Sequence, residues 1–591
     1  DKAIRTTLEL EGVTVNYLDP LPKVTGVNAF GTVTGERFEM RTWEGALYGL
    51  SADEASIVID DLGGAETATI DVTVSGPMRD ALEVLAHPFL GYPQKLGIDP
   101  ESVGGAATTN LHFTFPLLKD LALDEVGVTA DSTLRDVDVK AAFDGFDLTG
   151  GPLSLALDGK GMDIAGPVVL NGVPADGAWR ENFSDAVPFR SRFMLSGRFT
   201  DGQRRALDMP GQAYVAGPAD IDVEIIDLLD GRRRWRISAD LKDSEVRLPE
   251  IFWSKPAGVE GIAQFDAVGE PGKPLVVESV EVAGGDLVAR GRAEVEAESG
   301  AIRRLDLSRL SFGLTDLRAT LVAIGDGGYT VALDGASLDA RPYLEDDYGD
   351  EALTMLSLTA RLDRVITRDG ETLGGVEAAL RLVGGRWEQM QVDGVLNGGK
   401  PVSMRIGPTK DGRLFWMASD DAGSVLRALG IFDNAVEGKL VLLANLDADG
   451  ADGAIEGELR VDDFKVRDAP LLAKILSLAS LTGIFDLLTG EGLPFSRLIV
   501  PFTKRGETID IREAHTYGPA LGFTFEGGID LAADTAELKG TVVPAYMINS
   551  VLGKIPLIGD ILVGPKGGGV FAVTYSLKGP LDDPEIAVNP L

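Results

Sequence analysis

The pattern that decides the fold is clearest in the stretch LSLTARLDR at residues 356–364. Every second residue is apolar, which puts Leu356, Leu358, Ala360 and Leu362 on one face of an extended chain. The residues between them are Ser357, Thr359, Arg361 and Asp363. A two-residue period of this kind is typical of a β-strand with one dry face and one wet face.

The same alternation recurs along most of the chain. Further examples are TIDVTVSG (69–76), LHFTFPL (111–117), LSLALDG (153–159), DIDVEIIDL (220–228), YTVALDG (329–335), KLVLLANLD (439–447), LGFTFEGGIDL (521–531) and VFAVTYSL (570–577). Asp-Gly or Asn-Gly pairs follow many of these runs, as at 158–159, 334–335 and 397–398. Such pairs favour tight hairpins, because both residues tolerate positive φ. The sequence therefore predicts a mostly β protein built from consecutive antiparallel hairpins.

Chain length decides between architectures. A sandwich or small barrel uses about 100–250 residues, whereas this chain has 591 residues and no Pro/Ser-rich linker. About 40 strands spaced about 4.8 Å apart would extend on the order of 190 Å. We therefore predict one long, curled antiparallel β-sheet that forms an elongated hydrophobic groove. Its apolar face is too long for a few helices to cover, so it must curl, pair with a second sheet or hold something apolar.

A few segments have helical periodicity, and we expect them to form short amphipathic helices, mainly toward the C-terminus. They are residues 78–91, 420–433, 469–490 and 545–564. The change of character near residue 420 predicts two regions. Residues 1–420 would be a repetitive β-groove, and residues 421–591 would combine strands with amphipathic helices that cap it.

Composition excludes several classes of protein. The chain has 55 Lys and Arg against 92 Asp and Glu, a formal charge of −37, and phosphate binding over a broad nucleic-acid surface needs the opposite balance. It has no Cys, which excludes disulfides, thiolate metal sites and Cys nucleophiles. The best candidate for a membrane span, ILSLASLTGIF at 475–485, has only eleven residues and is too short to cross a bilayer. Since Asp1 begins the chain without an initiator Met or a signal segment, we expect a processed protein or an excised part of a longer one.

Motifs that indicate catalysis or metal binding are sparse. The three histidines, His87, His112 and His515, share no HExxH spacing, and neither a G-x-S-x-G elbow nor a Walker motif occurs. The segment DADGADGAIEGE (447–458) is similar to a calcium loop but lacks the required Gly at its sixth position, so a hairpin turn is the better interpretation. A carboxylate pair of the glycosidase type stays open, because its spacing of about 5–10 Å is three-dimensional. We expect no enzymatic activity, no cofactor and no metal.

The apolar face is what remains as a candidate site. We nominate seven residues of this face as lipid-binding, namely Leu356, Leu358, Leu362, Leu440, Leu442, Phe571 and Val573. The alternative at each position is a core packed against the protein itself, which is the default for alternating residues.

Three segments toward the C-terminus resemble the AsmA-like family, specifically its YhdP/TamB-type branch. They are RVDDFKVRDAPLLAKILSLASLTGIFDLLTGEGLPF (460–495), TVVPAYMINSVLGKIPLIGDILVG (541–564) and GVFAVTYSLKGPLDDPEIAVNPL (569–591). The resemblance covers about residues 350–591. The earlier part of the chain is similar to the family in its general sequence pattern more than in specific motifs.

This resemblance implies a non-enzymatic protein of the Gram-negative cell envelope. Its bulk would lie in the periplasm, anchored to the inner membrane by an N-terminal segment absent from this chain. The family is implicated in bridge-like phospholipid transport between the inner and outer membranes, with acyl chains in a hydrophobic groove. Partners would be phospholipid acyl chains and proteins of either membrane.

Two other hypotheses are kept. One is a periplasmic scaffold that assists outer-membrane protein assembly or envelope integrity, with its apolar face filled by protein. The other is a carbohydrate-active or adhesive β protein, which ranks lower because aromatic residues make up only 7% of the chain.

Overall fold

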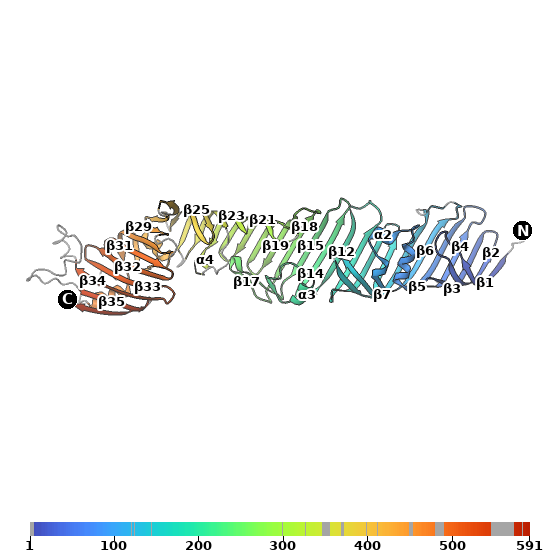
Figure 1. Cartoon of the computed structure of the whole chain (residues 1–591), viewed down its shortest axis with the longest axis horizontal. Coiled ribbons are helices and arrows are strands. Elements are labelled where there is room, and N and C mark those ends of the chain that lie inside the picture. Colours follow the sequence, from blue (N-terminus) through green and yellow to red (C-terminus); the bar gives the residue numbers. More distant parts are fainter. Residues whose placement is uncertain are drawn as a thin grey trace, which may run out of the picture. The chain divides into compact units, whose positions relative to one another are not determined.

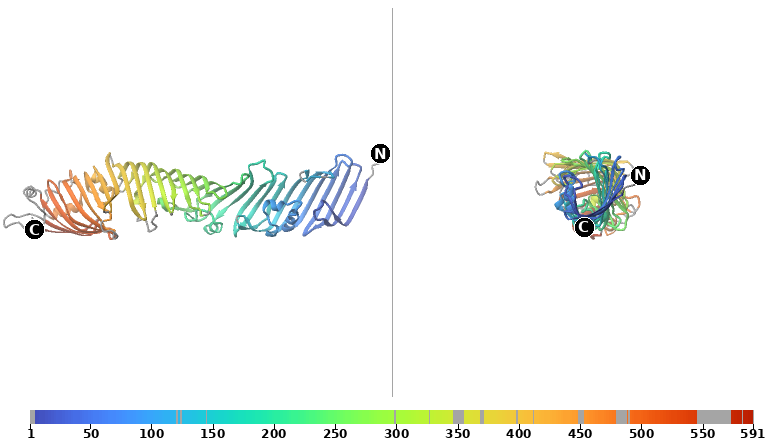
Figure 2. Two further views of the ribbon diagram at one scale, coloured as in Figure 1. Left: turned by 45° about the horizontal axis from the view of Figure 1, so that its top comes forward. Right: turned by 90° about the vertical axis from the view of Figure 1, so that its right-hand side faces the viewer.

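The computed structural model confirms a mostly β fold, with 67% of residues in strands and 9% in helices. It describes residues 5–119, 121–122, 125–143, 145–297, 299–325, 327–345, 355–367, 371–396, 399–410, 412–447, 453–478, 488, 490–544, 573–581 and 583–590. Within these residues, 33 strands belong to one curled hydrogen-bonded sheet (Figure 2). A separate small sheet consists of β13 (Val215–Ala216), β16 (Glu245–Leu248) and β17 (Trp253–Lys255).

The chain divides into two compact units, residues 1–285 with 290–301 and residues 286–289 with 302–591. The boundary falls in strand β20 (Leu287–Val295). The division that we predicted at residue 420 concerns a change in sequence character, and it stays a prediction.

The first unit is a succession of neighbouring strands, shown from blue to green in Figure 1. Their bounds are β1 Thr6–Val15, β2 Val24–Val33, β3 Arg37–Leu47, β4 Leu50–Asp60, β5 Thr67–Pro77, β6 Val103–Pro116, β7 Gly127–Phe143, β8 Phe146–Gly150, β9 Leu153–Asp158, β10 Gly161–Leu170, β11 Val173–Asn182, β12 Phe189–Phe199, β14 Ala219–Leu228, β15 Arg233–Asp240, β18 Gly261–Gly269 and β19 Leu275–Gly284. Neighbours pair antiparallel, and the short strands β8 and β9 both pair with β7 and with β10.

The second unit is also a succession of neighbouring strands, and Figure 2 shows them side by side in sequence order. Their bounds are β21 Ile302–Phe312, β22 Thr315–Ile324, β23 Gly328–Asp339, β24 Met355–Ile366, β25 Thr372–Val383, β26 Arg386–Leu396, β27 Lys400–Thr409, β28 Gly412–Ser419, β29 Ala435–Asn445, β30 Ile455–Val466, β31 Leu493–Arg505, β32 Thr508–Tyr517, β33 Leu521–Asp530, β34 Thr535–Pro544, β35 Val573–Pro580 and β36 Glu585–Pro590.

One pair corrects the prediction of a purely antiparallel sheet. Strands β23 and β24 pair parallel, with Gly328 opposite Met355 and Asp339 opposite Ile366. A parallel pair needs a crossover connection of about a dozen residues, and residues 340–354 supply it. Because β23 and β24 are parallel, the sheet is mixed. Hairpin signals such as Asp-Gly pairs do not predict a crossover of this kind.

The helices are short and are spread over both units, so among the described residues they are not concentrated toward the C-terminus. They are α1 Met78–Leu85, α2 Tyr92–Leu96, α3 Asp201–Ala206, α4 Arg341–Glu345, α5 Ala422–Ala428 and α6 Pro470–Leu478, with short 3-10 turns at Pro100–Ser102 and Pro249–Ile251. The predicted helices at 78–91 and 420–433 are confirmed in part by α1 and α5, and α6 covers the start of 469–490. The predicted helix at 545–564 lies outside the described residues.

The connections give each unit two different edges. In the first unit, α1, α2, α3 and the small sheet all join strand ends at one edge, as the strand registers show. In the second unit, α4, α5 and α6 likewise leave strands at one edge. We call this the helix edge of each unit, and the opposite side, where tight turns join the strands, the hairpin edge.

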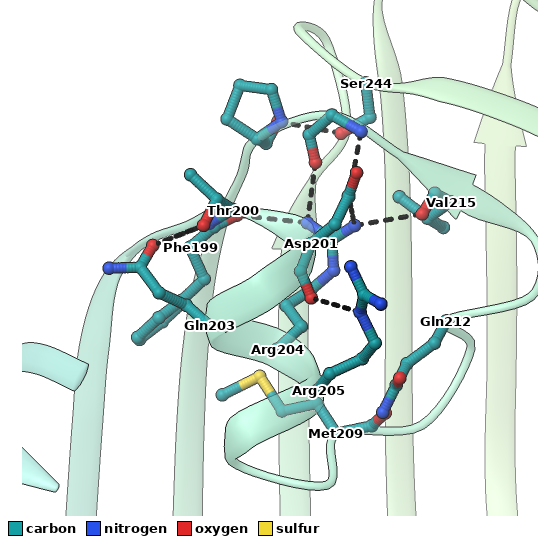
Figure 3. Close-up of polar contacts among 12 residues, drawn as sticks. Phe199, Thr200, Asp201, Gln203, Arg204, Arg205, Met209, Gln212, Val215 and Ser244 are labelled. Atoms are coloured by element: carbon teal, nitrogen blue, oxygen red, sulfur yellow. Dashed lines mark hydrogen bonds and ion pairs between the residues drawn. The ribbon is translucent and has the colours of Figure 1, made fainter. Parts of the chain in front are cut away.

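Buried cations fix the small sheet at the helix edge of the first unit. The Arg204 guanidinium donates hydrogen bonds to the carbonyl oxygens of Gly217 at 2.7 Å, Val215 at 2.9 Å and Phe199 at 3.0 Å, and it pairs with Asp201 (Figure 3). This network ties α3 to β13 (Val215–Ala216). Five donors in a planar fork suit several acceptors held in one plane.

Lys255 is the buried cation that holds the other two strands of the small sheet, β16 (Glu245–Leu248) and β17 (Trp253–Lys255). Its ammonium donates to the carbonyl oxygens of Ser244 and Val259, both at 2.8 Å, and of Pro256 at 3.1 Å. Burial lowers the pKa of Lys255. Its aliphatic stem lies against Gly261, where an added Cβ would come 2.9 Å from Lys255 Cε. The small sheet is therefore packed onto the main sheet at a position that requires glycine.

Candidate functional site

The candidate site is the apolar face of the main sheet, which the strand registers define most clearly in the second unit. Directly opposed residues of β21 to β29 form two rows. The first row, nearer the hairpin edge, is Leu305, Leu321, Val331, Leu358, Leu380, Met390, Ile406, Phe415 and Ala444. The second row is Leu307, Ala319, Leu333, Ala360, Ala378, Val392, Met404, Met417 and Leu442. All eighteen positions listed here are apolar across nine strands.

The opposite face is polar and exposed. On β24, Thr359, Arg361 and Asp363 are all exposed. Cross-strand ion pairs recur on this face, such as Arg318 with Asp334. Opposite charges on neighbouring strands stabilise the strand pairing only modestly. They also keep this face hydrated and discourage edge-to-edge association.

The apolar face is not uniformly covered. In the first row, Val331, Leu358 and Leu380 are only half-buried although they lie in the middle of their strands. A third row nearer the helix edge, which includes Leu317, Leu362 and Val376, is buried, each side chain being 4% exposed. The face is therefore closed by protein at the helix edge and accessible toward the hairpin edge.

Helix α5 lies at the helix edge of the second unit. It follows β28 and packs on β29, and its residues Val425 and Leu426 are buried. Arg427 reaches back to Glu371, at the start of β25, with Nε 2.7 Å from Oε1. The Arg427 side chain thus links α5 to the start of β25. The Asp421 side chain caps the N-terminus of the helix by accepting from the Ser424 N–H at 3.1 Å.

Burial increases farther along the second unit. In the first row, Ile406 on β27 is 6% exposed and Ala444 on β29 is 4% exposed, whereas Val331, Leu358 and Leu380 on β23 to β25 are half-buried. Two methionines, Met404 and Met417, lie directly opposite each other in the second row, and Met390 lies opposite Ile406 in the first. Their unbranched side chains fill irregular space and adapt to different neighbours.

An aromatic cluster occupies the apolar face near the C-terminus. Phe464 and Phe495 stack at 5.3 Å, and Phe523 lies 6.2 Å from Phe495 and 6.4 Å from the Tyr575 ring. The Tyr575 hydroxyl donates to the Thr524 carbonyl oxygen at 3.0 Å, and burial raises the pKa of Tyr575. These rings are all buried, so this part of the face is a packed core.

A charged cluster marks the hairpin edge of the second unit. Asp447 accepts from Arg413 at 2.8 and 2.9 Å and from Arg386 at 2.5 Å, which links the starts of β26 and β28 to the end of β29. The hydrogen bonds from Arg413 lower the pKa of Asp447 to about 2. Such a tether keeps neighbouring hairpin tips in register.

The first unit has a comparable apolar face. Opposed residues of β1 to β7 form the row Leu8, Gly31, Met40, Ile57, Ile70, Phe113 and Val128. A buried cluster of Leu134, Val137, Leu153 and Val168 lies farther along the unit.

Six of the seven nominated residues lie on the apolar face of the second unit. Leu356, Leu358 and Leu362 lie on β24, Leu440 and Leu442 on β29, and Val573 on β35. Phe571 lies outside the described residues. Leu356, Leu358, Leu442 and Val573 are half-buried, whereas Leu362 and Leu440 are covered by the protein, at 4% and 1% exposed. At those last two positions the structure has the packed core that was the alternative interpretation.

Sequence reasoning missed neighbours of these residues, such as Val331, Leu380 and Met390. Each lies in an alternating segment, so the signal was present. The cross-strand register that places them beside Leu358 depends on the parallel pair and on bulges such as the one between Arg381 and Leu382.

His112 has polar side-chain partners at both of its ring nitrogens. His112 Nδ1 lies 2.7 Å from Asp71 Oδ1, and its Nε2 lies 3.1 Å from Thr114 Oγ1. This order of groups is that of a hydroxyl–His–carboxylate triad, but it stands on the exposed polar face of β5 and β6. Both neighbours of β6 are paired with it, which uses backbone N–H groups that an oxyanion hole would need. We interpret it as a cross-strand polar pair.

The side-chain hydrogen bonds of His87 and His515 to described residues are local. His87 Nδ1 accepts from the Phe89 N–H at 3.3 Å, and His515 Nδ1 lies 3.2 Å from the Glu513 carbonyl oxygen. Over the residues that the structure describes, no group of three or more His, Asp or Glu side chains could hold a metal ion.

Comparison with protein-family models gives no match, and comparison with curated proteins gives none either. The resemblance to the AsmA-like family therefore stays a prediction. None of the helices in the described part of the chain is both long enough and apolar enough to cross a membrane.

Proposed function

We propose that this chain is a non-enzymatic, lipid-binding protein that holds phospholipid acyl chains along the apolar face of its curled sheet. The observation that carries the proposal is the half-buried first row around Val331, Leu358 and Leu380, an apolar strip that the protein leaves accessible in the middle of its strands. Together with the resemblance to AsmA-like proteins, it supports phospholipid transport between the inner and outer membranes through the periplasm.

The energetics favour such a strip. Burying apolar surface contributes about 0.8 kcal/mol per methylene, so two long acyl chains in water would cost well over 10 kcal/mol. A continuous apolar surface removes most of that cost without a reaction centre. The closed helix edge and the accessible hairpin edge suggest that acyl chains lie against the rows while head groups stay in water beyond the hairpin edge.

The scaffold hypothesis has its own supporting observation. The aromatic cluster around Phe495 and the residues under α5 show that parts of the apolar face are filled by protein. If the half-buried strip were also covered, by a partner protein, the chain would act as an envelope scaffold.

Lipid extraction and mass spectrometry on the purified chain separate the two. We expect reproducible phospholipid on the wild type and loss of most of it from Leu358→Asp combined with Leu380→Asp. The matched control is Thr359→Asp, one residue away on the exposed polar face, which should retain its lipid. Lipid-free wild type, folded and stable without detergent, would refute the proposal and favour the scaffold.

A further inference from the structure

One buried carboxylate on the apolar face of the first unit forms no ion pair with any residue that the structure describes. Four charged side chains are buried in the described part of the chain: Glu181, Arg204, Lys255 and Glu371. Arg204 pairs with Asp201, Glu371 pairs with Arg427, and Lys255 donates to three carbonyl oxygens. Glu181, which is 5% exposed, differs from the other three.

The hydrogen bonds of Glu181 come from neutral donors. The Ser191 hydroxyl and the Trp179 indole N–H, the latter at 3.3 Å, both donate to Oε2. Among the described residues no group donates a hydrogen bond to Oε1. A buried carboxylate is stabilised mainly by a cation and by filling its remaining acceptor sites. Glu181 therefore has acceptor capacity at Oε1, and a carboxylate without an ion-pair partner, as far as the described residues are concerned.

The neighbours of Glu181 add an aromatic wall. Glu181 lies near the end of β11 at the hairpin edge, opposite Met162 on β10 and Ser191 on β12. Trp179, the next residue of β11 on the same face, stacks on Phe193 with ring centroids 5.7 Å apart and an angle of 18° between the planes. The N–H edge of the indole points at the carboxylate, and the indole ring stacks on Phe193. The carboxylate is thus bounded on one side by aromatic rings.

The site is continuous with an apolar row. Trp179 is opposite Ile164 and Phe193, and the row continues through Ile225 and Trp235. On the hairpin side of it runs a polar row, Glu181, Ser191, Asp227 and Arg233, in which Arg233 forms a two-point ion pair with Asp227 at 2.6 and 3.1 Å. A molecule bound here would place an apolar part against the rings and a polar part at the hairpin edge.

We propose that Glu181 and Trp179 form a subsite for a primary ammonium group, and that this group is the amino head group of a lipid whose acyl chains lie on the adjoining apolar row. A primary ammonium supplies up to three N–H donors and a positive charge, which the carboxylate accepts in charge-assisted hydrogen bonds. A trimethylammonium group carries the charge but has no N–H to donate. This inference rests on the proposed lipid-binding function and adds the class of head group to it.

The test uses the whole chain and competing head groups on identical acyl chains. Wild-type protein is incubated with vesicles of phosphatidylethanolamine, phosphatidylglycerol and phosphatidylcholine in equal amounts, re-isolated, and its lipid quantified by mass spectrometry. We expect phosphatidylethanolamine to be enriched about tenfold over the other two, which corresponds to about 1.4 kcal/mol. Uptake in the input ratio by the wild type overturns the inference without any variant.

Glu181→Gln keeps the shape of the side chain and removes its charge. We expect this variant to bind the same total lipid but in the input ratio. Glu54→Gln, at an exposed position on the opposite face of β4, should keep the enrichment. Enrichment that survives Glu181→Gln overturns the subsite, whereas absence of lipid from all proteins overturns the lipid-binding function and the inference with it.

A soluble amine is the other source of the same chemistry. Phosphoethanolamine without acyl chains is therefore tested at the same concentration, with equilibrium dialysis as the readout. Retention as strong as that of the lipid would overturn the assignment to a lipid head group. We expect retention at least tenfold weaker, because the acyl chains supply most of the binding free energy.

Discussion

The Arg427–Glu371 ion pair is predicted to hold α5 over the apolar face, and breaking it should loosen that helix more than any other element. Arg427 Nε lies 2.7 Å from Glu371 Oε1, and its NH1 donates to the Ala435 carbonyl oxygen at 2.9 Å. Glu371 is only 6% exposed. Removing one partner of a buried pair costs about 3–5 kcal/mol, so we expect Arg427→Met to destabilise the closed position of α5 by about 3 kcal/mol.

Hydrogen exchange measures this locally. Amide protection in α5 and at the start of β25 should fall by about two orders of magnitude, since 1.4 kcal/mol is tenfold, while protection in β5 and β6 should be unchanged. Glu371→Gln together with Arg427→Met should cost at least 1 kcal/mol less than the sum of the two single changes, because the buried charge is gone. Strict additivity, or unchanged protection in Arg427→Met, would refute the reasoning.

Two further predictions concern stability. The pKa of Asp447 is about 2 in the folded chain against an ordinary 3.8, so its ion pair with Arg413 should stabilise the fold above about pH 4 and lose that effect as the pH falls toward 2. Urea unfolding of wild type and Asp447→Asn should thus differ at pH 6 and converge at pH 2, and a constant difference would contradict this. Gly261→Ala should lower the melting temperature because its Cβ would meet Lys255 Cε at 2.9 Å. Gly159→Ala, with open space around its Cβ, should not, and equal shifts would argue against the packing account.

The periodicity of the sequence was enough to predict the strands and their two faces. Alternation in 356–364 correctly predicts β24 and puts Leu356 and Leu358 on its apolar face, since a strand's side-chain period is fixed by backbone geometry. The turn pairs likewise predict hairpins, because their conformational preferences are local. Capping and periodicity also predict α5.

Features that depend on long-range contacts were not predictable. The parallel pairing of β24 with β23 follows from a crossover that no local signal marks. Leu362 and Leu358 look alike in sequence, yet Leu362 is covered and Leu358 is not, because closure comes from elements at the helix edge. Glu181 in ADGAWREN reads as an ordinary polar strand residue, and only the register places it beside Trp179, Ser191 and the apolar row.

Site-specific photocrosslinking tests the central claim most directly. A photoreactive phenylalanine analogue is placed at Leu358, on the half-buried first row, and in a second protein at Thr359, on the exposed polar face of the same strand. If acyl chains lie against the apolar face, illumination in cells should attach phospholipid at position 358 and not at position 359. Equal labelling at both positions, or protein but no lipid attached at position 358, would contradict the account.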